Sequence, residues 1–212
     1  MRSSRCAESV DMTDAVICPK CLKEDLLCVC AGVVPMETRH HVLILQHPQE
    51  PDKELGTARL THLALPNSTM KAGLSWPNLS RALGRPAVNA NWGVLYLGGQ
   101  QRLSHAGLTI LAKDREIDTA ETPLEGIVAL DGTWSQAKTL WWRNAWLLKL
   151  KRLVLRPSHP SLYGKLRKEP RAECLSTIES VAETLDALGE NPAIGEALRG
   201  LFAELLRRYR AR

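Results

Sequence analysis

The sequence lacks the long apolar segments that carry a chain into or across a membrane. No run of roughly 18 consecutive apolar residues occurs, so no transmembrane helix is predicted. The N-terminal stretch MRSSRCAESVDMTD contains no apolar segment of the kind found in signal peptides. We therefore expect a cytoplasmic protein with no membrane partner. Clustered cysteines in that compartment stay reduced, and they serve as metal ligands or redox groups rather than as disulfides.

A strong excess of charge of one sign is also absent. Lys and Arg number 28 and Asp and Glu 23, which gives a formal net charge of +5 and a pI near 9.0. This bias suits a nucleic-acid partner but is common in other proteins, so the distribution of charge is more informative. Between Lys149 and Arg171 there are eight basic residues and one acid. The run is either a solvated face or a surface that contacts RNA phosphates. The candidate RNA-binding residues are Arg143, Lys149, Lys151, Arg152, Lys165, Arg167, Lys168 and Arg171.

The chain shows no internal repeat, and its 212 residues fit one sizeable domain with a small appendage. Residues 1–15 are polar and aperiodic and are predicted to be a disordered tail. Residues 16–36 form a short cysteine-rich segment, and residues 37–212 form the main domain. Strands are predicted at 40–46, 93–98, 126–131 and 152–156, and helices at about 57–64, 78–84, 133–148, 177–188 and 192–210. Apolar strands that alternate with helices predict an α/β fold, with a mostly parallel sheet covered by helices on both faces.

Four of the cysteines lie close together in the cysteine-rich segment. Cys18, Cys21, Cys28 and Cys30 have the spacing C-x2-C-x6-C-x-C. Four thiolates within a short loop can surround one zinc ion as a tetrahedron, and such a closed site is structural rather than catalytic. A thioredoxin-like role requires one C-x-x-C pair at a strand-to-helix junction, and the second pair argues against it. The sequence therefore predicts a zinc knuckle in residues 16–36.

A carboxylate stands at the joint between a predicted strand and a predicted helix. The apolar run GIVALD ends at Asp131, Gly132 allows a tight turn, and Thr133 with Gln136 forms a capping box that begins a helix. In open α/β sheets, ligands bind in the crevice at the carboxyl ends of the strands. Asp131 is thus either a turn residue or part of a ligand site.

The tryptophans are concentrated just after this joint. Four of the six lie between residues 126 and 146. Indoles at helical spacing usually pack in a core, and we expect this for Trp141, Trp142 and Trp146. Trp134 is the exception, because it sits in the first turn where it can stack on a base or an adenine ring.

Several of these motifs together resemble the DTW-domain family of tRNA-uridine aminocarboxypropyltransferases. LDGTW followed by QAK is similar to the most specific motif of that family, and CPKC…CVC resembles its N-terminal cysteine cluster. His47, Pro48, Glu50 and Thr57 match its H-P-x-E…T segment. LYLGG stands where the family has L-Y-P-G, so Leu97 replaces a proline. SLYGKLRKEP and CLSTIES resemble two further elements, with Ser180 in place of an alanine.

The resemblance implies a SPOUT-like fold with a knotted C-terminal half, and an enzyme with S-adenosylmethionine as cosubstrate. The reaction implied is transfer of the 3-amino-3-carboxypropyl group to N3 of a tRNA uridine, which gives acp3U and methylthioadenosine. A methyltransferase of similar architecture and a non-catalytic, zinc-containing RNA-binding protein are the alternatives. The oligomeric state is open.

The chemistry requires a group that removes the N3 proton and a pocket that orients the sulfonium. Asp131 is the candidate general base, with Glu50 and His47 in reserve and Trp134 beside it. The glycines after the second predicted strand allow a close approach of backbone to ligand, and Ser176 with Glu179 forms a second capping box. Arg167 is an alternative partner for the cosubstrate carboxylate. The candidate cosubstrate-binding residues are Thr57, Leu97, Gly98, Gly99, Leu130, Gly132, Thr133, Ser176, Thr177 and Glu179.

Overall fold

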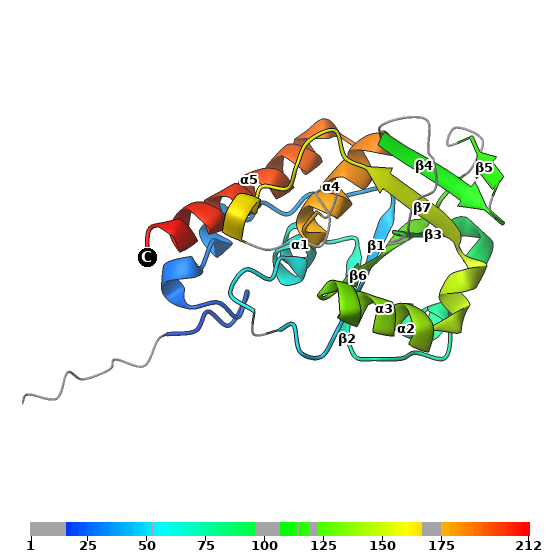
Figure 1. Cartoon of the computed structure of the whole chain (residues 1–212), viewed down its shortest axis with the longest axis horizontal. Coiled ribbons are helices and arrows are strands. Elements are labelled where there is room, and N and C mark those ends of the chain that lie inside the picture. The colour runs from blue at the N-terminus through cyan, green and yellow to red at the C-terminus, as the bar shows by residue number, and fades with distance from the viewer. Residues whose placement is uncertain (1–15, 52, 96–106, 114, 119–122, 167–174) are drawn as a thin grey trace, which may run out of the picture.

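A computed structural model of the chain describes residues 16–51, 53–95, 107–113, 115–118, 123–166 and 175–212. Within these residues a seven-stranded sheet has the order β2-β1-β6-β3-β7-β4-β5 (Figure 1). The strands are β1 (His41–Gln46), β2 (Ser68–Ala72), β3 (Trp92–Leu95), β4 (Gly107–Ala112), β5 (Arg115–Ile117), β6 (Gly126–Asp131) and β7 (Lys151–Arg156). The five strands from β2 to β7 in this order are parallel, whereas β4 pairs antiparallel with both β7 and β5. The mostly parallel α/β sheet predicted from the sequence is confirmed.

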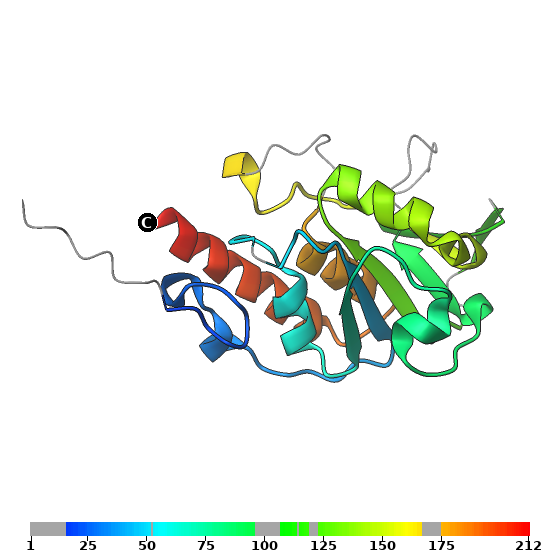
Figure 2. The ribbon, with the colours of Figure 1, turned by 90° about the horizontal axis from the view of Figure 1, so that it is seen from below.

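Helices cover both faces of this sheet, as expected. They are α1 (Ala58–Ala64), α2 (Leu79–Leu83), α3 (Trp134–Arg143), α4 (Thr177–Ala187) and α5 (Pro192–Arg210). Alternate residues of β1 point to opposite faces: Val42 and Ile44 pack toward α1, α4 and α5, and Leu43 and Leu45 pack toward α2 and α3. Figure 2 shows these two groups of helices on either side of the strands. Since β1 and β6 lie inside the sheet and are buried on both faces, they are continuous apolar runs in the sequence.

Three strands were not predicted. β2 is a partly exposed edge strand with the sequence STMKA, so it lacks an apolar run. β4 and β5 form an antiparallel hairpin at the opposite edge, and β5 has only three residues. Of the predicted strand 93–98, the structure describes residues 93–95, which lie in β3, and residues 96–98 lie outside the described part. The knotted path implied by the resemblance stays a prediction.

The helix predicted at 133–148 is wrong in its second half. α3 ends at Arg143, and a separate 3-10 turn, η4, covers Ala145–Lys149. Asn144, which is fully buried, makes this break. Its amide nitrogen donates to the carbonyls of Leu140 and Leu74, at 2.8 and 3.0 Å, and its amide oxygen accepts from Trp76 N at 2.8 Å. The side chain thus satisfies backbone groups that a continued helix would use differently.

This break separates the tryptophans. Trp146 is 6% exposed, and its indole nitrogen donates to the carbonyl of Trp76 at 3.0 Å. Trp142 is 77% exposed, so the expectation that it packs in the core is wrong. α3 buries Ala137 and Leu140 against the sheet, and the position of Trp142 on the helix faces away from both.

The cysteine knuckle, residues 16–36, packs on α5. It contains two 3-10 turns, η1 (Asp25–Leu27) and η2 (Cys30–Gly32), and Leu22 adopts a positive φ of 57°. Figure 1 shows this blue segment against the C-terminal end of α5, where Arg208 donates to the carbonyl of Cys28. Leu27 and Val29 belong to the same apolar core as the leucines of α5. In the part of the chain that the structure describes, no helix is both long enough and apolar enough to cross a bilayer.

Candidate active site

The carboxyl ends of β1 and β6 bring Asp131 next to a glutamine. The two strands run parallel, with Gln46 in register with Asp131. Gln46 Nε2 donates to Asp131 Oδ2 at 2.8 Å, and Thr177 Oγ1, at the start of α4, donates to Asp131 Oδ1 at 2.5 Å. Asp131 is only 6% exposed. Each oxygen therefore accepts one hydrogen bond that orients the carboxylate, and each keeps a second lone pair for another donor.

The start of α1 is joined to the start of α4 at the same place. Thr57 is buried, and its Oγ1 accepts from the backbone N–H of Ile178 at 3.2 Å. Its carbonyl accepts from both the backbone N–H and the hydroxyl of Thr61, at 3.0 Å each. Thr57 thus connects α1 to α4, one residue beyond the Thr177 that holds Asp131.

The turn after β1 packs against the start of α3. His47 N donates to the carbonyl of Asp131 at 2.9 Å. The capping box predicted for α3 is confirmed: Thr133 N donates to Gln136 Oε1 at 2.6 Å, and Gln136 N donates to Thr133 Oγ1 at 3.4 Å. A Cβ added to Gly132 would lie 2.9 Å from Gln136 Cβ and 3.4 Å from His47 Cβ. The glycine is therefore required by close packing, and its φ does not lie in the left-handed region.

The reserve candidate Glu50 lies in this turn as well. It is 7% exposed, and its backbone N–H donates to the carbonyl of His47 at 3.0 Å. His47 is half-buried, and its Nδ1 accepts from the backbone N–H of Gln49 at 3.3 Å. Gln136 Nε2 reaches Gln49 Oε1 at 3.3 Å, which connects the turn to α3.

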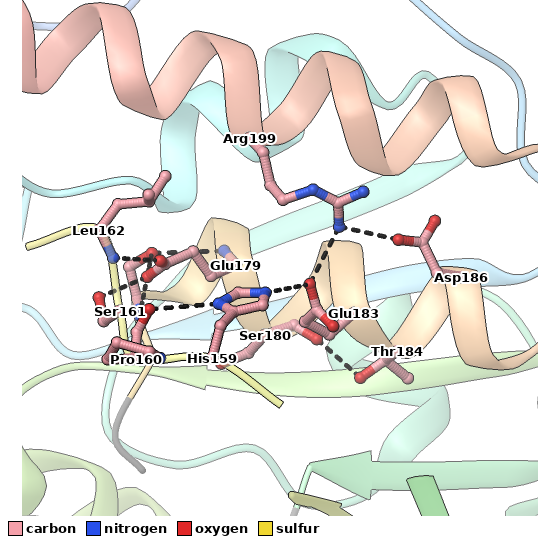
Figure 3. Close-up of polar contacts among 11 residues, drawn as sticks. His159, Pro160, Ser161, Leu162, Glu179, Ser180, Glu183, Thr184, Asp186 and Arg199 are labelled. Carbon is pink, nitrogen blue, oxygen red and sulfur yellow. Dashed lines mark hydrogen bonds and ion pairs between the residues drawn. The ribbon is translucent and has the colours of Figure 1, made fainter. Parts of the chain in front are cut away.

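The second predicted capping box, at the start of α4, is also confirmed, and it does more than begin the helix. Glu179 is fully buried, and one of its oxygens accepts from Ser176 N at 2.8 Å and Ser176 Oγ at 2.6 Å. Glu179 also accepts from Ser161 Oγ and from Leu162 N, at 2.7 Å each (Figure 3). Its carboxylate thus holds the segment after β7 against α4.

A chain of ionic groups continues along α4 and α5 from this point. His159 Nε2 lies 3.2 Å from Glu183 Oε1, and Arg199 bridges Glu183 and Asp186 at 3.0 and 2.8 Å (Figure 3). The carbonyl of Pro160 and then the Glu183 carboxylate raise the pKa of His159 above its usual value. The groups fix the packing of the two helices behind the site.

The remaining predicted residues are divided between described and undescribed parts of the chain. Leu97, Gly98, Gly99, Arg167, Lys168 and Arg171 lie outside the described residues, and Lys165 is described only as part of the 3-10 turn η5, Gly164–Leu166. Leu130 is buried in β6, next to Asp131. Lys151 and Arg152 are neighbours on β7, so their side chains leave opposite faces of the sheet. Lys151 donates to the carbonyl of Ala90, and burial lowers its pKa.

The four cysteines of the knuckle have the geometry of a metal site. Their Sγ atoms all lie within 4.8 Å of one another, and Cys18 and Cys30 Sγ are 3.8 Å apart. A tetrahedron with Zn–S bonds of about 2.3 Å has sulfur–sulfur edges of about 3.8 Å. The backbone N–H of Cys21 is the main cause that lowers the pKa of Cys18 to about 6, whereas burial raises the pKa of Cys21 and of Cys30. Binding of a metal by those two thiols must therefore displace their protons. The residues fit a structural zinc ion.

Sequence reasoning missed Gln46 and Ser161. Gln46 ends an apolar strand, and a polar residue there carries no motif of its own. Its role depends on Asp131, 85 positions later. Ser161 is the first residue of the SLYGKLRKEP motif, but its hydrogen bond to Glu179, 18 positions later, is found only once the fold is known. The available signal was the position of Gln46 at the carboxyl end of a predicted parallel strand.

The family model described as DTW domain matches residues 15–210. The chain belongs to the DTW domain family. The matched range includes the cysteine knuckle, the Asp131 site and the whole of α5. It covers most of the chain, as the motif resemblance implied.

Three curated proteins similar to this DTW domain share a name. The chain is 31% identical over 189 residues to the tRNA-uridine aminocarboxypropyltransferase 2 of Mus musculus, and 29% identical over 192 residues to that of Macaca fascicularis. Each alignment covers 85% of the chain and 59% of the relative. The Drosophila melanogaster protein of the same name is 29% identical over 192 residues, covering 85% of the chain and 70% of the relative. The chain thus spans about three fifths of the mammalian relatives. No solved structure matches it.

Proposed function

We propose that the DTW domain transfers the 3-amino-3-carboxypropyl group of S-adenosylmethionine to N3 of a tRNA uridine, with acp3U and methylthioadenosine as products. The names of the relatives support tRNA uridine as acceptor. The observation that carries the proposal is the oriented carboxylate of Asp131, held by Gln46 and Thr177 at the carboxyl edge of the parallel sheet.

In this reaction Asp131 acts on the acceptor. Uridine N3 carries a proton and becomes a nucleophile when the proton is removed. The free lone pair of a carboxylate oxygen accepts this proton as the N3–carbon bond forms and the carbon–sulfur bond breaks. The sulfonium of the donor makes the γ-carbon electrophilic, and the sulfur leaves as a neutral thioether. The sulfonium thereby loses its positive charge, and Asp131 loses its negative charge because its carboxylate takes up the proton.

The residues around Asp131 position the donor. A sulfonium has three carbons open to attack, so selection of the γ-carbon requires that the donor be held in one orientation. Gly132, Thr133 and Thr177 come from the starts of α3 and α4, where helix dipoles favour the donor carboxylate. Thr57, Ser176 and Glu179 support the donor site without contacting the donor, because protein groups already occupy their hydrogen-bonding atoms.

The decisive experiment is incubation of the protein with total tRNA and S-adenosylmethionine, followed by analysis of the small-molecule product. Methylthioadenosine supports the proposal, adenosylhomocysteine indicates a methyltransferase, and no turnover indicates a binding protein. Asp131→Asn keeps the shape of the side chain, and we expect it to lower kcat by about 10²–10⁴-fold as loss of a general base. Turnover above a tenth of the unsubstituted protein contradicts this role. Glu196→Gln, an exposed carboxylate-to-amide change on α5, is the matched control.

A further inference from the structure

Two tryptophans and a lysine recur along α3 at a spacing of four residues: Trp134 is half-buried, and Lys138 and Trp142 are exposed. Trp134, Lys138 and Trp142 follow one another by about one turn along the helix, and Trp142 faces away from the buried Ala137 and Leu140. Lys138 Nζ lies 5.5 Å from the centroid of the Trp134 ring, within the range of a cation–π contact. We name Trp134, Lys138 and Trp142 the α3 stripe.

The stripe begins at the candidate active site and leads away from it. Trp134 is the first residue of α3, three positions after Asp131. With a rise of 1.5 Å per residue, Trp142 lies about 12 Å farther along the helix axis. The stripe therefore runs from the carboxyl end of β6, the strand that ends at Asp131, to the far end of α3, where Arg143 and Lys149 are exposed.

The charge along this part of the chain has one sign. Between Asp131 and Glu169 the sequence contains no acidic residue, and Lys138, Arg143 and Lys149 are all exposed. Trp142 is 77% exposed among them, whereas the neighbouring Trp146 fills the core. An exposed indole beside several cations complements a partner with flat aromatic rings and a negative backbone.

We propose that the α3 stripe binds unpaired RNA nucleotides that flank the target uridine. Trp142 stacks on a base, and Lys138, Arg143 and Lys149 contact phosphates. Unpaired bases are the partner of choice, because a base inside a duplex offers no free face for stacking. The inference deepens the proposed function and rests on it, since it assumes that the uridine lies at Asp131.

The test compares binding of single-stranded and double-stranded RNA. The probes are an oligouridine of about ten nucleotides and an RNA duplex of equal length, titrated against the full chain at one salt concentration. Trp142→Leu keeps apolar bulk but removes the aromatic face. We expect it to weaken binding of the single strand by about 5- to 150-fold, the range for loss of one stacked base, and to leave the duplex unchanged. Trp142→Phe retains a ring and gives a smaller loss.

Val88→Ala is the matched control. Val88 is 59% exposed and precedes β3 in the chain. The first residue of β3 pairs with the first residue of β6, and Asp131 is the last residue of β6. Val88 therefore lies near the opposite end of these strands from Asp131. It should change neither affinity. Lys138→Gln should lower the slope of log affinity against log salt by about one.

Two outcomes overturn the inference. One is equal weakening for both probes, and the other is unchanged affinity of Trp142→Leu for the single strand, including the case in which the substitution dissociates a dimer. That case would assign the stripe to contact between two copies of the chain. Absence of aminocarboxypropyl transfer by the unsubstituted protein, with the single-strand effect intact, refutes the proposed function but not the RNA surface.

Discussion

At the scale of single residues, Gln46 is the group whose importance the structure adds. Its amide donates to Asp131, while its Oε1 is buried without a hydrogen-bond partner among the described residues. A buried amide that keeps an unpaired oxygen is costly. The hydrogen bond from Gln46 to Asp131 offsets part of this cost and orients the carboxylate, so we assign Gln46 a positioning role.

We predict that Gln46→Met, which keeps the length of the side chain, lowers kcat by about 10- to 100-fold, because a carboxylate displaced by a fraction of an ångström is poorly aligned. KM for tRNA should change less than threefold, since Gln46 is buried and offers no surface to a macromolecule. Steady-state kinetics with tRNA as the varied substrate measure both values. The urea midpoint identifies a simple loss of folding, and an unchanged kcat contradicts the role.

His41 predicts a pH dependence of stability. Its Nδ1 lies 2.8 Å from Asn67 Oδ1 and its Nε2 2.9 Å from Thr69 Oγ1, an arrangement that a neutral ring satisfies. Burial lowers the pKa of His41 below its usual value, and burial does the same for His62. Because the unfolded chain takes up protons first, stability is full above about pH 6.5 and is lost as the pH falls below it.

We therefore expect the urea concentration at the midpoint of unfolding to decrease when the pH is lowered from 7.5 to 5.5. His41→Gln removes one titrating ring and should reduce the size of this fall. A midpoint that rises toward acid would show that another group, such as His159 with its raised pKa, dominates.

At the scale of elements, the sequence predicts the strands and helices in which each face is uniformly buried or uniformly exposed. β1 and β6 are buried on both faces, and α5 has apolar residues at spacings of three and four, so each is found with bounds close to those observed. β2 is a partly exposed edge strand, and α3 stops because the Asn144 side chain bonds to segments far away in sequence. Local patterns contain no trace of such long-range contacts.

The packing of α4 on α5 gives a prediction with an internal control. A Cβ added at Gly195 would lie 2.7 Å from Asp186 Cγ, and Asp186 also binds Arg199 at 2.8 Å. A Cβ at Gly200 on the same helix meets nothing within 4 Å. We expect Gly195→Ala to lower the free energy of unfolding by about 1–3 kcal/mol through overpacking. Gly200→Ala should raise it by up to about 1 kcal/mol. Urea unfolding measures both, and equal effects of the two substitutions contradict the close packing.

At the scale of the whole molecule, the site is an assembly of segments that only the fold brings together. Asp131 meets Gln46 and Thr177 across 85 and 46 positions, and Ile178 meets Thr57 across 121. The sequence indicates Asp131, both capping boxes and the cysteine tetrad, because each is a local motif. It does not indicate which of them meet, because that depends on the strand order.

The cysteine knuckle extends the core of the molecule, and this predicts a large effect of metal removal. Cys21, Leu27 and Val29 belong to the apolar core that also contains Leu201 and Leu205 of α5. We expect a strong zinc chelator to lower the thermal midpoint of the full chain, and added zinc to restore it, because binding energy at such a site is folding energy. Differential scanning calorimetry with metal analysis measures this. Less than half an equivalent of zinc with an unaltered midpoint contradicts a structural ion.

The contact between the knuckle and α5 also sets an order of events during synthesis. Arg208 donates a hydrogen bond to the carbonyl of Cys28, which lies 180 residues earlier in the chain. At a ribosomal rate of about 5–20 residues per second, the covering helix follows the cysteines by about 10–40 s. For that interval the cysteine knuckle lacks its contact with α5, so its packing is completed only after α5 has been synthesised.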